Sequence, residues 1–188
     1  MVHVTNALPD NGTSIHWHGI RQLNSVHADG AVAVTQCPIA PGDTFTYRFK
    51  ATQYGTGWYH SHFSMQYSDG LLGAVVIHGP SSANWDIDVG PVIMMDWFHK
   101  TAFALEEAFL HKVTGISPPA SNGLVNGIST FNCDLFDPLD KNCVGGGKYW
   151  ETTFVPGKKH LLRLVSLDVE DCWMICADRH GRSIRALM

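Results

Sequence analysis

The amino-acid sequence predicts an all-β fold in which short strands form a β-sandwich or barrel. The chain has 188 residues, enough for one ordinary domain or two small ones. It contains 18 glycines and 9 prolines, so turns are frequent. Segments of alternating or continuous apolar residues lie between these turns, and strands at this density are typical of sandwiches and barrels.

The first 80 residues contain most of the expected strands. Phe45, Tyr47 and Phe49 alternate with polar residues, a period-2 pattern that gives one aromatic face. Turns such as the Pro-Gly-Asp segment at 41–43 separate the apolar segments. The strands expected here cover residues 2–7, 13–20, 44–50, 57–63 and 71–78.

A second unit is expected to follow a linker at residues 81–85. Phe103, Glu106 and Leu110 recur at helical spacing, so residues 101–112 are expected to form a helix. The two prolines at 118–119 would prevent its extension. The strands expected in this part cover residues 91–97, 149–155 and 159–165.

Charge and composition exclude some classes of partner. The 13 basic and 17 acidic residues give a formal charge of −4, so the chain has no basic excess for nucleic acid. The longest apolar run, residues 71–77, is far shorter than the roughly 18 residues that span a bilayer, and no signal peptide is visible. We therefore expect neither nucleic-acid binding nor membrane insertion.

Two His-x-His pairs, His16/His18 and His60/His62, are the main candidate metal ligands. On a strand, residues i and i+2 point to the same face, so each pair presents two imidazoles side by side. Paired imidazoles on a rigid strand suit copper or zinc. Four ordinary half-buried histidines remain the alternative, although two pairs beside aromatic residues make it the weaker one.

Zinc alone fits this pattern less well than copper. A structural zinc site usually recruits thiolates, and a hydrolytic one needs a nearby carboxylate base. The residues after His18 are Gly19, Ile20 and Arg21, which do not continue a metallo-hydrolase motif or supply the glutamate of a cupin. A zinc hydrolase stays open as an alternative, which metal analysis would test.

The two histidine pairs lie in longer segments that resemble the first two copper-binding motifs of multicopper oxidases. These segments are Asn-Gly-Thr-Ser-Ile-His-Trp-His-Gly at 11–19 and Gly-Trp-Tyr-His-Ser-His at 57–62. The Asp-Gly at 29–30, the Cys-Pro-Ile at 37–39 and the Asp-Gly-Leu-Leu-Gly at 69–73 also match. The chain is similar to laccases of the ascomycete fungal type, from about residue 2 to about residue 165.

The resemblance implies a cupredoxin-like Greek-key fold and a role for each matching residue. His16 would bind the type-2 copper of a trinuclear cluster, and His18, His60 and His62 would bind its type-3 pair. Asp29 would help deliver protons to that cluster. The parent enzyme would oxidise phenolic donors by one electron each and reduce dioxygen to water. Residues 1–80 would form a first domain shortened at its N-terminus, and 81–188 an incomplete second domain.

The sequence also departs from the family's pattern. The motifs His-Pro-x-His-x-His and His-Cys-His, which supply the other cluster ligands and the type-1 copper, do not occur. We therefore expect a fragment or truncated product that is inactive alone and needs a missing third domain or a partner subunit. A non-catalytic copper-binding protein is the alternative. The isolated histidines, interpreted as surface or structural residues, are His3, His27, His78, His99, His111, His160 and His180.

The cysteines and a sequon bear on the cellular compartment. The resemblance implies a disulfide between Cys133 and Cys143, and a free Cys37 whose family partner lies in the third domain. Cys172 and Cys176 would lie too far apart on a strand to pair. With the N-glycosylation sequon at Asn11, these features favour a secreted protein.

Overall fold

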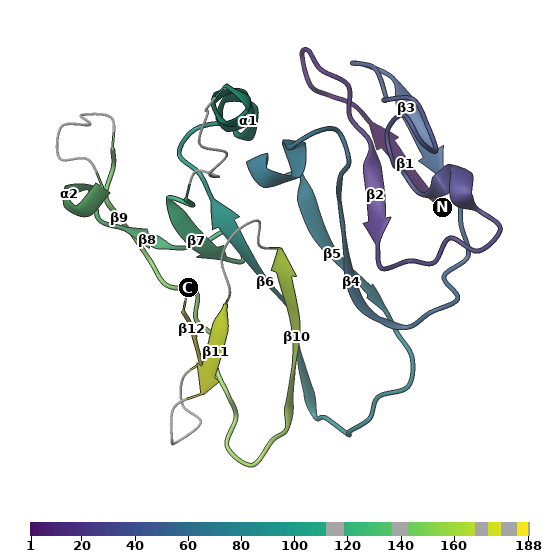
Figure 1. The fold of residues 1–188 in the computed structure, drawn as a ribbon. Coiled ribbons are helices and arrows are strands. Elements are labelled where there is room, and N and C mark those ends of the chain that lie inside the picture. Colours follow the sequence, from purple (N-terminus) through teal and green to yellow (C-terminus); the bar gives the residue numbers. More distant parts are fainter. Residues whose placement is uncertain (112–118, 137–142, 168–172, 178–183, 188) are drawn as a thin grey trace. The chain divides into compact units, whose positions relative to one another are not determined.

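The structure is a computed structural model in which residues 1–111, 119–136, 143–167, 173–177 and 184–187 are described (Figure 1). The chain divides into two compact units. Unit 1 comprises Met1–Pro80 and Thr101–Lys112, and unit 2 comprises Ser81–Lys100 and Val113–Met188. Both units are built mainly from short strands, so the all-β prediction is confirmed.

Unit 1 contains two antiparallel sheets among its described residues (Figure 1). One pairs β1 (Val2–Thr5) with β3 (Thr44–Tyr47). In the other, β4 (Gly55–Ser61) lies between β2 (Ile15–His18) and β5 (Leu72–Ile77). All five strands fall within segments expected from the alternating or apolar patterns, apart from the first two residues of β4.

The core of unit 1 forms on one side of β2. Ile15, Trp17 and Tyr47 are buried there, together with Ala28 and Ile39. The Trp17 ring centroid lies 5.6 Å from that of Tyr47, and the Ile15 N–H donates to the Tyr47 hydroxyl at 2.8 Å. Because side chains alternate along a strand, burial of positions 15 and 17 turns positions 16 and 18 to the other face.

Three short helices complete unit 1: the 3₁₀ helices η1 (Val26–Ala28) and η2 (Gln66–Asp69), and α1 (Ala102–Leu110). The predicted helix is confirmed, and Thr101 caps it by accepting the Ala104 N–H. The Asp69 carboxylate accepts the Ala102 N–H at 2.7 Å. Two side chains therefore satisfy free amides of the first turn of α1.

Unit 2 is organised around β6 (Ile87–Trp97), which pairs with β10 (His160–Leu167) in parallel and with β7 (Asn122–Val125) antiparallel. Val92, Met94, Met95, Val165 and Leu167 are buried in these strands. The remaining elements are β8 (Thr130–Phe131), α2 (Cys133–Phe136), β9 (Gly146–Gly147), β11 (Met174–Ala177) and β12 (Ile184–Leu187).

One strand prediction in unit 2 is wrong. Residues 149–155 form no strand, although exposed and half-buried residues alternate over 151–155. Alternation indicates an extended chain, but a strand also needs a hydrogen-bonded neighbour, and this segment has none in the described part of the chain. In the same described part, no helix is long and apolar enough to cross a lipid bilayer.

Candidate metal centre

Antiparallel pairing of β2 with β4 brings the two His-x-His segments together. In this register His16 lies directly opposite His60, and His18 lies opposite Trp58. Opposite residues on neighbouring strands have Cβ atoms roughly 5 Å apart, so their imidazoles can meet on the face away from Ile15 and Trp17. The ring centroids of His16 and His60 are 5.2 Å apart, and those of His16 and His18 are 5.6 Å apart.

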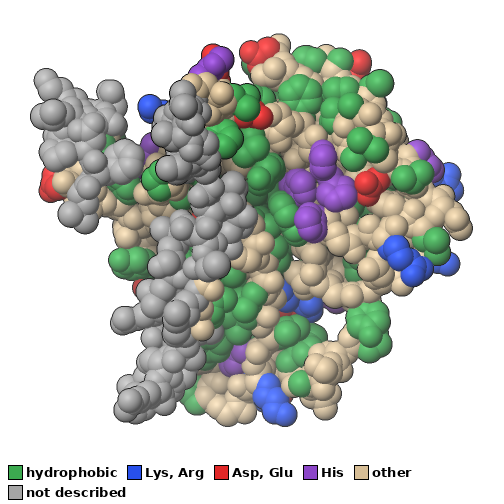
Figure 2. Space-filling view, in the orientation of Figure 1, with side chains coloured by type: hydrophobic (Ala, Val, Ile, Leu, Met, Phe, Trp, Pro, Cys, Tyr) green, Lys and Arg blue, Asp and Glu red, His purple; other side chains and the backbone are tan. Residues whose placement is uncertain are grey.

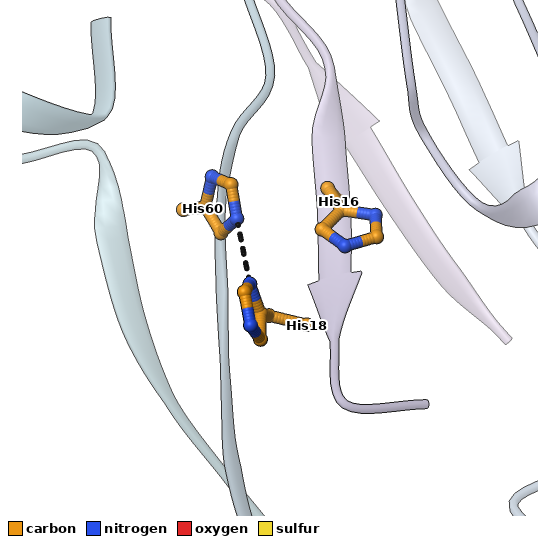
Figure 3. Close-up of side chains that lie close together, drawn as sticks. All are labelled: His16, His18 and His60. Atoms are coloured by element: carbon orange, nitrogen blue, oxygen red, sulfur yellow. Dashed lines mark hydrogen bonds between the residues drawn. The ribbon is translucent and has the colours of Figure 1, made fainter. Parts of the chain in front are cut away.

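Three imidazoles offer nitrogens that converge on one region (Figure 3). One nitrogen from each of His16, His18 and His60 lies within 4.8 Å of the other two. His62 follows the last residue of β4 and lies outside this group, but its ring centroid is 5.5 Å from that of His16. Figure 2 shows histidine side chains gathered on the surface of the molecule. The structure thus places all four predicted ligands side by side.

Backbone carbonyls fix the orientation of two of these rings. The Nδ1–H of His16 donates to the Asp29 carbonyl oxygen at 2.8 Å, and that of His60 donates to the Ser61 carbonyl oxygen at 2.8 Å. A histidine that donates from Nδ1 keeps its Nε2 lone pair free, which is the arrangement of a metal-binding imidazole. His16 and His60 are therefore set to bind a cation through Nε2.

His18 completes the group from the same strand as His16. Its Nδ1 lies 3.3 Å from Nε2 of His60 (Figure 3). Because Nε2 of His60 holds a lone pair, the Nδ1–H of His18 donates to it in the metal-free chain. A cation between the two rings would replace this proton, with His18 bound through Nδ1. The three donors therefore fit a borderline transition metal that prefers imidazole.

The position of Asp29 depends on the glycine that follows it. Gly30 has φ of +85°, and a Cβ at this position would lie 1.9 Å from the Ile15 carbonyl oxygen. Only glycine allows the loop after η1 to approach β2 this closely. The Asp29 carbonyl thereby reaches His16, while its carboxylate Oδ1 lies farther from the same Nδ1, at 3.4 Å.

Burial and mutual repulsion favour the neutral form of two of the imidazoles. The pKa of His60 is lowered to about 4, chiefly by desolvation and also by the neighbouring histidines, against the opposing effect of the hydrogen bond to Ser61. Desolvation, with a smaller effect of His16, also lowers the pKa of His18 below its usual value. Both shifts favour the neutral imidazole, which is the form that binds a metal.

Trp58 is part of the site, a role that was not predicted from the sequence. Its ring stacks on that of His60 with centroids 4.1 Å apart, and on that of His18 at 4.7 Å. The signal that identifies it is the period of β4, because residue 58 must share a face with residue 60. Gln66, a buried residue of η2, was likewise not singled out from the sequence.

None of the other predicted residues in the described part of the chain belongs to this group. The Cys133–Cys143 disulfide is confirmed in unit 2, and Cys37 is exposed with a free thiol. Cys172 lies outside the described residues, as does His180, and only the backbone of Cys176 is described. Among the isolated histidines, His3 contacts the Thr46 hydroxyl at 2.8 Å on the β1–β3 sheet.

Comparisons with known proteins identify the relatives of this chain. Two family models described as multicopper oxidase match residues 1–82 and 88–180. Laccase-2 of Botryotinia fuckeliana is 50% identical over 99% of this chain and 31% of its own length. Dihydrogeodin oxidase of Aspergillus terreus is 48% identical over 95% of this chain and 29% of its own length.

The crystal structure of the laccase from Botrytis aclada matches with a TM-score of 0.80 and 56% identity. The match covers 88% of this chain and 30% of that laccase chain, and it confirms the predicted cupredoxin-like fold. The chain thus spans about a third of the length of the relatives it matches. The matches of both halves to the same family establish that this chain belongs to the multicopper oxidases.

Proposed function

We propose that this chain is part of a laccase-type oxidase, in which it forms half of the cradle of a trinuclear copper cluster. The parent enzyme oxidises phenolic donors by one electron each and reduces dioxygen to water. The observation that supports this most strongly is the convergence of imidazole nitrogens from both His-x-His segments within 4.8 Å. The laccases among its relatives support the same activity class.

Each histidine has its own part in this proposal. His16 binds the type-2 copper, whereas His18, His60 and His62 bind the type-3 pair. When bound, the copper ions supply the one-electron redox chemistry through which dioxygen is reduced. The chain's own contribution is to hold four imidazoles close together, with two rings oriented by carbonyl hydrogen bonds.

Asp29 supplies a proton-carrying group next to His16. Its Oδ1 lies 3.4 Å from Nδ1 of His16, and its side chain is one quarter exposed. Reduction of dioxygen consumes protons, and a carboxylate with access to solvent can take up a proton and pass it inward. In this proposal the Asp29 carbonyl orients the imidazole while the carboxylate relays protons.

The remaining parts of the cluster come from elsewhere. Residues 1–80 form the first cupredoxin-like domain in this proposal, and 81–188 the start of the second. The other cluster ligands and the type-1 copper belong to a third domain or a partner subunit, because the motifs for them do not occur in this sequence. The chain alone is expected to bind copper weakly and to have no phenol oxidase activity.

Secretion is part of the same proposal. The Cys133–Cys143 disulfide is typical of proteins in an oxidising compartment. Asn11 is exposed and begins an Asn-Gly-Thr sequon, so it can accept a glycan. These features support an extracellular location.

Copper titration of the purified chain tests the proposal directly. We expect binding of Cu²⁺ in preference to Zn²⁺ from an equimolar mixture, and loss of that binding in His16→Ala and His60→Ala. His3→Ala is the matched control, because His3 lies on a strand of the same unit outside the histidine group. Stoichiometric zinc without copper would support the zinc hydrolase instead.

An oxygen-consumption assay with a phenolic donor distinguishes a laccase-type oxidase from a non-catalytic copper-binding protein. The proposal expects no activity from the 188-residue chain, and activity once the missing cluster ligands and type-1 copper are supplied by fusion to the corresponding part of a related laccase. Copper binding without activity in that fusion would favour the non-catalytic copper-binding protein. Oxidase activity of the chain alone would contradict the proposed division of the cluster.

A further inference from the structure

A buried group of three polar side chains includes Ser61, the residue between His60 and His62. The Thr13 hydroxyl and the Ser61 hydroxyl both donate to Oε1 of Gln66, each at 2.6 Å. All three residues are buried. We call Thr13, Ser61 and Gln66 the Gln66 junction. An amide oxygen has two lone pairs, so these two donors use its whole accepting capacity.

The Gln66 junction joins the two segments that present the histidines. Thr13 lies in the segment that leads into β2, three residues before His16. Ser61 is the last residue of β4 and lies between His60 and His62. Gln66 begins η2, beyond both segments. One side chain therefore ties together the start of one histidine strand and the end of the other.

The connection continues from the Gln66 junction to a metal-facing ring. While the Ser61 hydroxyl donates to Gln66, the Ser61 carbonyl accepts the Nδ1–H of His60 at 2.8 Å. The Ser61 hydroxyl also accepts the Phe63 N–H at 3.2 Å, across the residue His62. The position of Ser61 thus affects both the tautomer of His60, through its carbonyl, and the turn that contains His62, through its hydroxyl.

Close packing around Gly12 makes the third contact of Gln66 possible. The Nε2–H of Gln66 donates to the Gly12 carbonyl at 3.4 Å. A Cβ at residue 12 would lie 2.6 Å from the Pro38 Cβ and 3.2 Å from the Phe63 ring, so a larger residue would separate these segments. Gln66 has partners for both its oxygen and its nitrogen, and an apolar replacement would leave two buried hydroxyls without their acceptor.

We propose that Gln66 is a positioning residue for the copper site: through Thr13 and Ser61 it holds the two His-x-His segments in register and fixes the tautomer of His60. This inference rests on the proposed function for its copper readout. The buried amide of Gln66 sets the geometry of the imidazoles in the metal-free chain as well. Loss of a group that orients a metal ligand typically weakens metal binding by ~10–100-fold.

The test compares Gln66→Met with Asn6→Leu in the 188-residue chain. Asn6 is a matched control, because it is a buried amide of the same unit and donates to the Asn11 and Ile39 carbonyls at 3.0 and 2.8 Å. Thermal unfolding of the metal-free chains measures stability. Titration with Cu²⁺ measures affinity, and ¹⁵N–¹H NMR of the imidazoles measures the tautomer of His60.

Both variants are expected to lose stability, but only Gln66→Met should weaken Cu²⁺ binding, by roughly 10-fold or more. Only Gln66→Met should also shift His60 away from the Nδ1–H tautomer. Wild-type copper affinity with an unchanged His60 tautomer in Gln66→Met would overturn the proposal, as would an equal effect of Asn6→Leu on both readouts.

Gln66→Met could fail to fold, and the wild-type chain could bind no copper. If Gln66→Met does not fold, Thr13→Val removes one of the two donors and should show the same changes at smaller amplitude. Unchanged copper affinity and imidazole signals in Thr13→Val would then overturn the proposal. If the wild-type chain itself binds no copper, the proposed function fails, while the NMR of the metal-free chains still decides the role of Gln66.

Discussion

Replacing Gly30 with alanine should disturb the metal centre through the backbone. The loop after η1, which contains Gly30, passes so close to Ile15 of β2 that an added Cβ would lie 1.9 Å from its carbonyl oxygen. Ordinary contacts of this kind begin at 3.4 Å, so the loop must move by about 1.5 Å or distort β2. That movement would withdraw the Asp29 carbonyl from Nδ1 of His16.

The magnitude follows from two effects. An alanine held at φ of +85° costs roughly 1–2 kcal/mol from backbone sterics alone. The collision with Ile15 adds about 1–3 kcal/mol, as for other insertions into closely packed sites. Gly42→Ala is the matched control, because Gly42 has φ of +83° but nothing within 4 Å of the added Cβ. The difference between the two variants isolates the collision.

Denaturant unfolding and copper titration of both variants provide the assay. We expect Gly30→Ala to lose at least about 1 kcal/mol more unfolding free energy than Gly42→Ala. Copper affinity should fall by roughly 10-fold in Gly30→Ala only, because the hydrogen bond that orients His16 is lost. Equal stability and equal copper affinity in the two variants would refute the argument that this loop orients His16.

Three other expectations follow from the structure. The pKa of His60 is about 4 in the folded chain but near the usual 6.5 in the unfolded chain, so the unfolded chain binds more protons between these two pH values. The unfolding free energy of the metal-free protein should therefore fall by up to about 3 kcal/mol as the pH falls from 6.5 to 4. A pH series of denaturation curves should show a shallower dependence in His60→Gln, and an identical dependence would contradict the low pKa of His60. Trp58→Leu removes two stacked ring contacts, so it should lower the unfolding free energy by about 1–3 kcal/mol and weaken Cu²⁺ binding. The side chain of Trp85 is exposed, and Trp85→Leu should have neither effect. Equal effects of the two substitutions would exclude a role for the stacking. Removing the disulfide by Cys133→Ser should lower the unfolding free energy of unit 2 by about 2–3 kcal/mol in denaturation experiments. Copper affinity should stay unchanged, because the histidine group belongs to unit 1.

The positions of the histidines were predictable because they depend on short-range rules. Alternation along a strand places His16 with His18 on one face and Trp17 on the other, and the structure shows this arrangement. Both β2 and β4 were identified as strands, although each expected end lies two residues from the observed one. The family motifs then suggested that the two pairs share one site.

The supporting contacts were not predictable, because they depend on pairing between distant segments. The register that sets His16 opposite His60 is a property of two strands more than forty residues apart. The hydrogen bond from His16 goes to the carbonyl of Asp29, whereas the sequence drew attention to its carboxylate. Gln66 is an unremarkable polar residue in the sequence, and only the fold brings it between Thr13 and Ser61.

Strand pairing also explains the error at residues 149–155. The pattern there is that of a strand, with exposed and half-buried residues in alternation. The neighbouring places on β6 are taken by β7 and β10, the latter in a parallel register that no local signal indicates. Local patterns therefore predicted extended chain but not the partner that makes it a strand.

A crystal structure of the copper-soaked protein, with anomalous data collected at the copper edge, tests whether the imidazoles share a metal site. We expect an anomalous peak among the converging nitrogens, about 2 Å from Nε2 of His16 or His60 and Nδ1 of His18. Copper bound elsewhere, with the four imidazoles unchanged and no peak between them, would contradict it.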